Sequence, residues 1–226
     1  MTTILNLLRK LSCTVDTETL NGIKNPEKAY HLAGIIHDNF GNVIAVFNYI
    51  IAELFDQIRY DDYAKKNFHK YQEMINDGSA TVVATVADAI KAIDELLTYY
   101  GVTEINAFNA DFDLRRGACA PLMENRVLVD TWLNALETIC QKASYRKFCA
   151  ENGFVNPRSG VCKTSAEAVY AYLTGNPDYE EEHTAMEDSK IEMAIYVACK
   201  QTHKRMTKGI CARDESAKGL FVWPKP

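Results

Sequence analysis

The chain has 226 residues, of which 47% are hydrophobic and 24% are charged. This composition is that of a globular protein and excludes a disordered or low-complexity chain. The formal net charge of −5 excludes a general polyanion binder, which would carry a basic excess. We therefore expect one domain over residues 1–226, with a core at about 11–204 and a C-terminal tail at 205–226.

The first fifty residues predict an antiparallel meander. Three β-prone apolar runs occupy residues 11–15, 30–37 and 42–51. The last two are separated by Asp38-Asn39-Phe40-Gly41, a composition typical of a tight turn.

Further along, helical and strand patterns alternate, which favours parallel strands joined by crossovers. Strands are expected at residues 104–108 and 126–129. Helices are expected at residues 61–76, 85–100, 111–119, 131–142, 165–173 and 185–204. Thr164-x-x-Glu167 and Thr184-x-x-Glu187 have the capping-box spacing that opens a helix. The sequence thus predicts an α/β fold, with three antiparallel strands leading into parallel ones.

The chain has seven cysteines, an odd number, and no two of them have CxxC spacing. They lie at positions 13, 119, 140, 149, 162, 199 and 211. No signal peptide pattern precedes them, and no apolar run is long enough to cross a membrane. We expect free thiols in a cytoplasmic protein with no membrane partner. Cys199 and His203 are one helical turn apart and are half of a zinc ligand set, but no clear second pair completes it.

Three polar groups stand where elements begin or end. Asp16 and Glu18 alternate along the end of the first strand and therefore share a face. Two carboxylates on one face repel each other, and a hard divalent cation removes that repulsion. Solvated acids at an exposed strand end remain the alternative.

The second group is Asn109-Ala110-Asp111-Phe112-Asp113, directly after a strand, where active sites of α/β sheets lie. Asp111 also suits the N-cap of the next helix, which would place Asp113 in the first turn.

The third group is His183 with Asp188, around the N-cap Thr184. Asp188 heads an apolar stripe of Ile191 and Ile195, so it should face the protein and need a partner there. His183 is placed to lie beside Asp188 as a base. A surface His and a dipole-stabilised Asp are the alternative. The acidic run Glu180–Glu182 is expected to be a solvated face.

Together these motifs resemble the DEDDh (DnaQ-like) 3′→5′ exonuclease superfamily, which includes the proofreading exonuclease of DNA polymerase III, ribonuclease T and oligoribonuclease. The residues carrying the resemblance are Asp16-Thr17-Glu18-Thr19, Asn109-x-x-Phe112-Asp113 and His183-x-Ala185-x-x-Asp188. Phe108 departs from the family, which often has His before the Asn; that position is not a metal ligand.

The resemblance implies a ribonuclease H-like fold with helices on both faces of the sheet and extra helices around 61–76 and 144–174. It also implies hydrolysis with two Mg²⁺ or Mn²⁺ ions. Asp16, Glu18 and Asp188 would hold one ion, Asp16 would also contact the second, and Asp113 would complete the site through water. His183 would be the general base. The terminal nucleotide would contact Thr17, Thr19, Leu20, Asn109 and Phe112. A basic rim is expected from Arg115, Arg116, Arg146, Lys147, Arg158 and Lys163.

The resemblance implies that the substrate is a free 3′ end, single-stranded or frayed. DNA is expected rather than RNA, because nothing in the chain resembles a dedicated reader of the 2′-hydroxyl. An exoribonuclease of the ribonuclease T or oligoribonuclease type would use the same residues. A non-catalytic nucleic-acid-binding module is a further alternative, although the five-residue catalytic set is intact.

Overall fold

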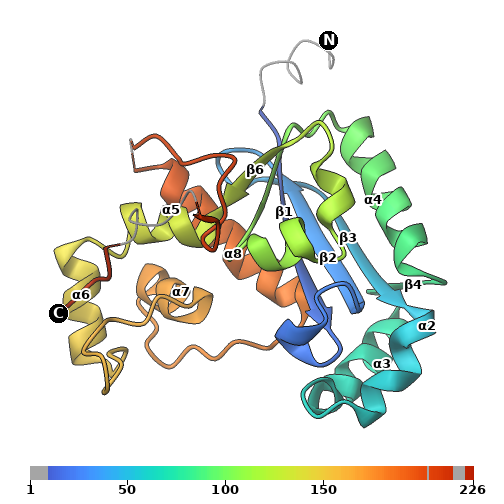
Figure 1. Cartoon of the computed structure of the whole chain (residues 1–226), viewed down its shortest axis with the longest axis horizontal. Coiled ribbons are helices and arrows are strands. Elements are labelled where there is room, and N and C mark those ends of the chain that lie inside the picture. The colour runs from blue at the N-terminus through green and yellow to red at the C-terminus, as the bar shows by residue number, and fades with distance from the viewer. Residues whose placement is uncertain (1–9, 203, 216–221) are drawn as a thin grey trace.

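The computed structural model describes residues 10–202, 204–215 and 222–226. In this part of the chain, six strands form one mixed sheet in the order β4-β3-β2-β1-β5-β6 (Figure 1). The strands are β1 (Ser12–Thr19), β2 (Ala29–His37), β3 (Val43–Ile51), β4 (Thr81–Val83), β5 (Glu104–Ala107) and β6 (Val127–Asp130). β1, β2 and β3 pair antiparallel, while β5 pairs parallel with β1, β6 with β5, and β4 with β3. The expected α/β, ribonuclease H-like sheet is confirmed; β4, only three residues long, was not predicted.

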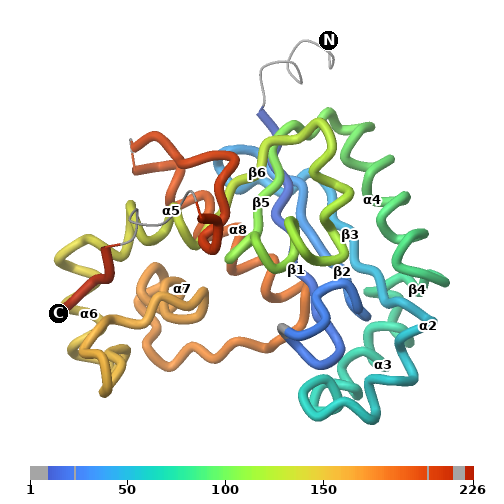
Figure 2. Tube along the Cα trace, viewed as in Figure 1, coloured from blue at the N-terminus to red at the C-terminus, as the bar shows by residue number. Residues whose placement is uncertain are grey.

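Helices cover both faces of the sheet, as expected. On one face, α4 (Val86–Tyr99) packs Ala89, Ile93 and Leu97 into the core cluster that holds Cys13 and Val15 of β1. On the other face lie α5 (Thr131–Thr138), α7 (Ala166–Thr174) and α8 (Ala185–Lys200), with α6 (Ala143–Glu151) farther out. Figure 2 shows α4 on one side of the strands and α8 with α5 on the other. Burial of two opposite faces explains why every residue of the central strand β2 is buried.

The segment between β3 and β4 is a chain of short helices. It contains α2 (Ala52–Phe55), 3₁₀ helices at Asp56–Tyr60 and Ala64–Asn67, and α3 (Phe68–Asp77). The helix expected at 61–76 begins later because the Asp61 carboxylate accepts the backbone N–H groups of Tyr63 and Ala64, at 2.8 and 2.9 Å. Such a side-chain turn competes with regular helix at its start.

Other helix boundaries also differ from expectation. α5 ends at Thr138, not at 142, because the Cys140 N–H bonds to the Ala135 carbonyl at 2.9 Å and tightens the chain end. α8 ends at Lys200, not at 204. The N-cap of α7 is Ser165, one residue after the expected Thr164, whose hydroxyl instead accepts Trp132 Nε1 at 3.1 Å.

The helix expected at 111–119 is a π-helical turn at Asp111–Arg116, followed by a 3₁₀ helix at Ala120–Met123. Asp111 does not cap it; Ala110 occupies the N-cap, and Asp111 Oδ2 instead accepts Arg116 Nε at 2.7 Å. Gly117 ends the turn at a close approach, since a Cβ there would lie 2.2 Å from the Phe112 carbonyl oxygen. A short 3₁₀ helix also follows β1 at Gly22–Lys24.

All seven cysteines are buried and free, as expected. The Cys199–His203 pair cannot be placed because His203 lies outside the described residues. Within the described residues, no helix has the length and apolar content that crossing a membrane requires. The tail is irregular at residues 204–214 and 222–226.

Candidate active site

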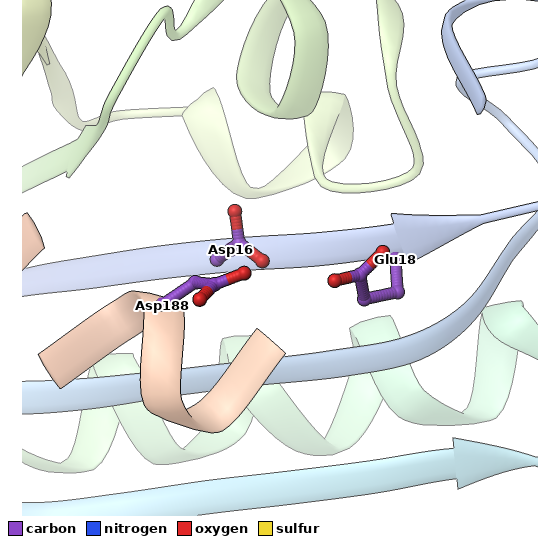
Figure 3. Close-up of side chains that lie close together, drawn as sticks. All are labelled: Asp16, Glu18 and Asp188. Atoms are coloured by element: carbon purple, nitrogen blue, oxygen red, sulfur yellow. The ribbon is translucent and has the colours of Figure 1, made fainter. Parts of the chain in front are cut away.

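The site is built where β1 passes the N-terminal turn of α8. Alternation along β1 separates Asp16 and Glu18 from their buried neighbours Val15 and Thr17. Asp188 lies in the first turn of α8 and is buried, with 8% of its surface exposed. Figure 3 shows Asp188 reaching from α8 toward Asp16, with Glu18 farther along the same strand. One carboxylate oxygen from each of the three lies within 4.8 Å of the other two.

The start of α8 is fixed by several hydrogen bonds. Thr184 is the N-cap, and its hydroxyl accepts the Glu187 N–H at 3.4 Å. His31 Nδ1, on β2, accepts the Ala185 N–H at 3.3 Å, while its Nε2 contacts Asn48 Oδ1 at 2.6 Å. Burial lowers the pKa of His31 to about 4, so its ring is a neutral acceptor at neutral pH. These bonds set the position of Asp188 relative to the sheet.

The donor set suits a hard divalent cation. The three residues offer only carboxylate oxygens, the ligands that Mg²⁺ and Mn²⁺ prefer. Asp188 Oδ1 is buried and accepts no hydrogen bond from the described residues. A buried carboxylate oxygen without a donor is costly unless a cation neutralises it. The residues present therefore fit a metal ion.

Asp113 lies beside this group, on the π-helical turn that follows β5. It is 2% exposed, and its Oδ1 accepts the hydroxyl of Thr17 at 2.5 Å. Burial raises the pKa of Asp113 to about 7, although the Thr17 hydrogen bonds oppose the shift. The turn that follows β5 thus places the Asp113 carboxylate against Thr17 of β1.

Burial and mutual repulsion raise the pKa of the clustered carboxyls. Burial raises the pKa of Asp188 to about 8, and the charges of Glu181 and Glu187 add to it. The pKa values of Asp16 and Glu18 are also raised, mainly by burial and then by neighbouring carboxylates. Without a cation, the group therefore holds protons near neutral pH, and a bound cation would release them.

Glu192 is a fifth carboxylate near this group, and no sequence motif indicated it. It is 5% exposed, and its Oε2 accepts the Phe108 N–H at 3.0 Å. Its charge is the largest Coulombic contribution to the raised pKa of Asp16, after burial. The spacing from Asp188 is four residues, so the two share a helix face, and that spacing could have identified it.

The segment before α8 differs from expectation in two ways. Glu181, expected on a solvated face, has only 18% of its side chain exposed, and burial raises its pKa. The His183 side chain is 68% exposed, and its Nδ1 lies 3.8 Å from Glu181 Oε2. The structure does not bring His183 into the carboxylate group; it lies one residue before the N-cap, with φ at 54°.

The residues that were expected to contact the substrate lie near the C-terminal ends of β1 and β5. Thr17 and Leu20 are buried, and Thr19 donates its hydroxyl to the Gly22 carbonyl at 2.9 Å. Leu20 lines a hollow of about 250 Å³ with Tyr60 and Asp61. Asn109 has a left-handed backbone with φ at 62°, and its buried Oδ1 accepts no hydrogen bond from described residues. Phe112 is half-buried, and its N–H bonds to the Asn109 carbonyl at 2.9 Å.

The expected basic rim divides into two groups. Three of its members are paired with acids: Arg115 with Asp214 at 3.0 Å, Arg116 with Asp111 at 2.7 Å, and Lys147 with Glu151 at 3.7 Å. The others, Arg146, Arg158 and Lys163, lie in and after α6.

No protein-family model and no curated protein matches the sequence. Among solved structures, E. coli exonuclease I in complex with a dA16 oligonucleotide matches with a TM-score of 0.50 and 16% identity. The match covers 85% of this chain and 41% of exonuclease I, so the chain spans less than half of that protein. Cell-death related nuclease 4 matches with a TM-score of 0.47 and 15% identity, over 88% of this chain and 67% of that one. At this identity the likeness to exonuclease I shows a similar fold.

Proposed function

We propose that this chain is a metal-dependent 3′→5′ exonuclease that hydrolyses nucleotides from the 3′ end of single-stranded or frayed DNA. The observation that carries the proposal is the approach of the Asp16, Glu18 and Asp188 carboxylates to within 4.8 Å. The buried, unpartnered Asp188 Oδ1 supports a cation there. The fold similarity to exonuclease I, a protein solved with a bound oligonucleotide, supports a nucleic-acid substrate.

In this proposal Asp16, Glu18 and Asp188 would hold one divalent ion, and Asp16 together with Asp113 would hold a second. The chemistry that two such Mg²⁺ or Mn²⁺ ions supply is activation of a water and stabilisation of the leaving oxygen. Thr17 holds the Asp113 carboxylate in place through its hydroxyl. Thr19, Leu20, Asn109 and Phe112 surround the terminal nucleotide.

His183 takes the proton of the attacking water in this proposal. Its ring is open to solvent and is carried by the segment that leads into Asp188. A neutral imidazole is a suitable general base near neutral pH. Movement of this exposed ring on substrate binding would bring it to the reacting water, since catalytic contacts often tighten only in the complex.

The test is release of mononucleotides from labelled single-stranded oligonucleotides in the presence of Mg²⁺ or Mn²⁺. With a 5′ label, we expect a ladder that shortens one nucleotide at a time; with a 3′ label, the first product is a labelled mononucleotide. The same oligonucleotide sequence is supplied as DNA and as RNA, and faster cleavage of DNA is expected.

The matched control is Asp16→Asn, which keeps the side-chain shape and removes one negative charge. It should abolish cleavage while leaving the fold intact by circular dichroism. Full activity in excess chelator, or efficient cutting of a closed circular single strand, would contradict the proposal. Much faster degradation of RNA would replace DNA with RNA as the substrate.

A further inference from the structure

A row of three aromatic side chains leads away from the carboxylates toward the C-terminal tail. Phe108 begins the row, and its N–H donates to Glu192 at the edge of the site. The Phe108 and Trp132 rings are 6.5 Å apart with an interplanar angle of 29°, and the Trp132 and Trp223 rings are 6.2 Å apart. Trp223, the third ring of this aromatic row, is 49% exposed. The row thus connects the proposed catalytic site to a partly exposed indole.

A hollow lies beside Trp223. It has a volume of about 410 Å³ and is lined by Trp223, Asn156, Lys163 and Thr164 among others. Trp132 reaches the same place, since its Nε1 donates to the Thr164 hydroxyl at 3.1 Å. The volume is within the range of small-ligand sites. An aromatic wall, uncharged polar groups and one ammonium together suit a nucleotide.

The surrounding segment carries the positive charge that the chain as a whole lacks. Residues 142–163 contain five basic side chains and one acidic side chain, a net charge of +4, whereas the chain has −5. Arg158 and Lys163 are exposed there. Lys163 Nζ lies 5.6 Å from the centre of the Phe154 ring, which leaves its ammonium near the hollow. A phosphate backbone is attracted to such a local basic region.

Hydrogen bonds from the rest of the protein hold the tail backbone on both sides of Trp223. Gln141 Nε2 donates to the Val222 carbonyl at 2.5 Å, and the Cys162 N–H donates to the Pro224 carbonyl at 2.9 Å. Arg146 Nη1 donates to the Lys225 carbonyl at 3.4 Å. Figure 2 shows this last part of the chain beside α6. An indole fixed in this way costs little entropy when a base stacks on it.

We propose that the Trp223 hollow is a binding subsite for single-stranded nucleic acid, upstream of the 3′ end held at the carboxylates. A base stacks on the Trp223 indole, and Lys163 and Arg158 hold the phosphates on either side. The position relative to the 3′ end rests on the proposed function, but binding itself does not. Stacking with backbone charge is the usual means of sequence-tolerant single-strand binding.

Binding is measured by fluorescence anisotropy with labelled dT12 and rU12 in excess chelator, so that no cleavage is needed. Trp223→Ala should weaken binding of at least one of the two by roughly 5- to 150-fold, the contribution of one base–aromatic stack. Trp223→Phe keeps a ring and should bind within a few-fold of wild type. Lys163→Gln should lower the salt-dependence slope by about 0.7, the value for one phosphate contact to a single strand.

Two further measurements separate a subsite from a structural role. The protein has only two tryptophans, Trp132 and Trp223, so stacking of dT12 should quench intrinsic fluorescence in wild type and much less in Trp223→Phe. With Mg²⁺, Trp223→Ala should raise the KM for dT12 and leave kcat unchanged, and a dinucleotide should be cleaved as by wild type. Tyr99→Ala, an exposed aromatic on α4, is the control and should change nothing.

The proposal is overturned if Trp223→Ala binds dT12 and rU12 as tightly as wild type, or if the wild type binds neither. Equal loss of dinucleotide and dT12 cleavage would also overturn it, since that indicates a disturbed catalytic site. A protein that binds oligonucleotides through Trp223 but releases no nucleotides would retain this subsite and refute the proposed exonuclease activity.

Discussion

His183 occupies a conformation that most residues avoid. Its φ of 54° is left-handed, and the strain of such a backbone in a residue other than glycine is about 1–3 kcal/mol. Two donors hold its carbonyl: Asn67 Nδ2 at 2.9 Å and Tyr71 Oη at 3.4 Å. A strained residue held by its surroundings is a reason to examine its side chain for function.

Replacing His183 separates catalysis from folding. His183→Ala should reduce the single-turnover rate by about 10²–10⁴-fold, the usual contribution of a general base, while metal affinity stays near wild type. His183→Gly should show the same loss of rate with equal or higher thermal stability, because glycine adopts positive φ without strain. Asp188→Asn, by contrast, should weaken metal binding itself.

The measurements are single-turnover cleavage, metal titration and thermal unfolding of the three variants. If His183→Ala cleaves at the wild-type rate, His183 has no part in the mechanism.

Glu192→Gln tests whether the fifth carboxylate belongs to the metal site. The amide oxygen can still accept the Phe108 N–H, so the main change is the loss of one buried negative charge. We expect Mn²⁺ affinity to fall by roughly 10- to 100-fold, the usual effect of removing a group that supports metal ligands. Calorimetric Mn²⁺ titration measures it, and Glu95→Gln on the exposed side of α4 is the control. Unchanged affinity in Glu192→Gln would exclude such a role.

Strand alternation and the Thr184 N-cap are local rules, and they predicted that Asp16 and Glu18 share a face and that Asp188 faces the protein. Those rules place the three side chains without knowledge of the rest of the chain. The resemblance to the DEDDh superfamily then joined the three into one expected site. Glu192 was missed because the α8 stripe was read through its apolar members, Ile191 and Ile195. The burial of Glu181 depends on how residues 176–184 cross the molecule, which no local pattern gives.

At the scale of elements, α3 is joined to the segment that carries His183. Asn67 and Tyr71 bind the His183 carbonyl, and Lys70 Nζ donates to the Glu182 carbonyl at 2.8 Å. The short helices between β3 and β4 therefore do more than cover the sheet. They fix the backbone from which the proposed base extends.

Loosening that attachment should lower turnover. Asn67→Ala removes the shorter bond to the His183 carbonyl, and we expect a fall in kcat of roughly 10- to 100-fold, as small misplacements of catalytic groups produce. KM should change little. In a His183→Ala background the same substitution should have almost no further effect, because the group that it positions is gone.

Asn76→Ala, at the exposed C-terminal end of α3, is the matched control and should keep full activity. An equal loss in the presence and absence of the His183 ring would show that Asn67 supports the fold rather than the base.

The longer elements were predictable because periodicity and caps act within each segment. α4, with the capping box of Thr85 and Asp88 and an apolar stripe, was found almost to the residue. The π-helical turn at Asp111–Arg116 was not, because it depends on the close approach at Gly117 and the pairing of Asp111 with Arg116. β4 has only three residues, two of them exposed, so it is too short to show an alternating pattern of its own, and its pairing with β3 depends on a distant part of the chain.

At the scale of the whole molecule, the carboxylate cluster costs stability when no cation is bound. Asp113 and Asp188 have pKa values of about 7 and about 8 in the folded protein, against 3.8 for an exposed Asp. Between pH 3.8 and about pH 8 the folded chain therefore binds more protons at these two carboxyls than the unfolded chain does. By linkage, the free energy of unfolding then falls as pH rises toward 8. His31 acts with the opposite sign, but only between its folded pKa of about 4 and its ordinary 6.5.

The chelated protein should therefore lose thermal stability as pH rises from 6.5 to about 8, a window above the ordinary pKa of histidine. Mg²⁺ at about 100 times its Kd should add about 2.7 kcal/mol. For a chain of this size that raises Tm by roughly 5–10 °C, with the larger effect at the higher pH because fewer protons must be displaced. Scanning calorimetry in chelator and in Mg²⁺ at both pH values measures this.

Asp188→Asn cannot ionise at that position, so its chelated form should show a weaker pH dependence and a smaller Mg²⁺ shift. A chelated wild type whose Tm is constant across the window, or unaffected by Mg²⁺, would refute a cation site at these carboxylates.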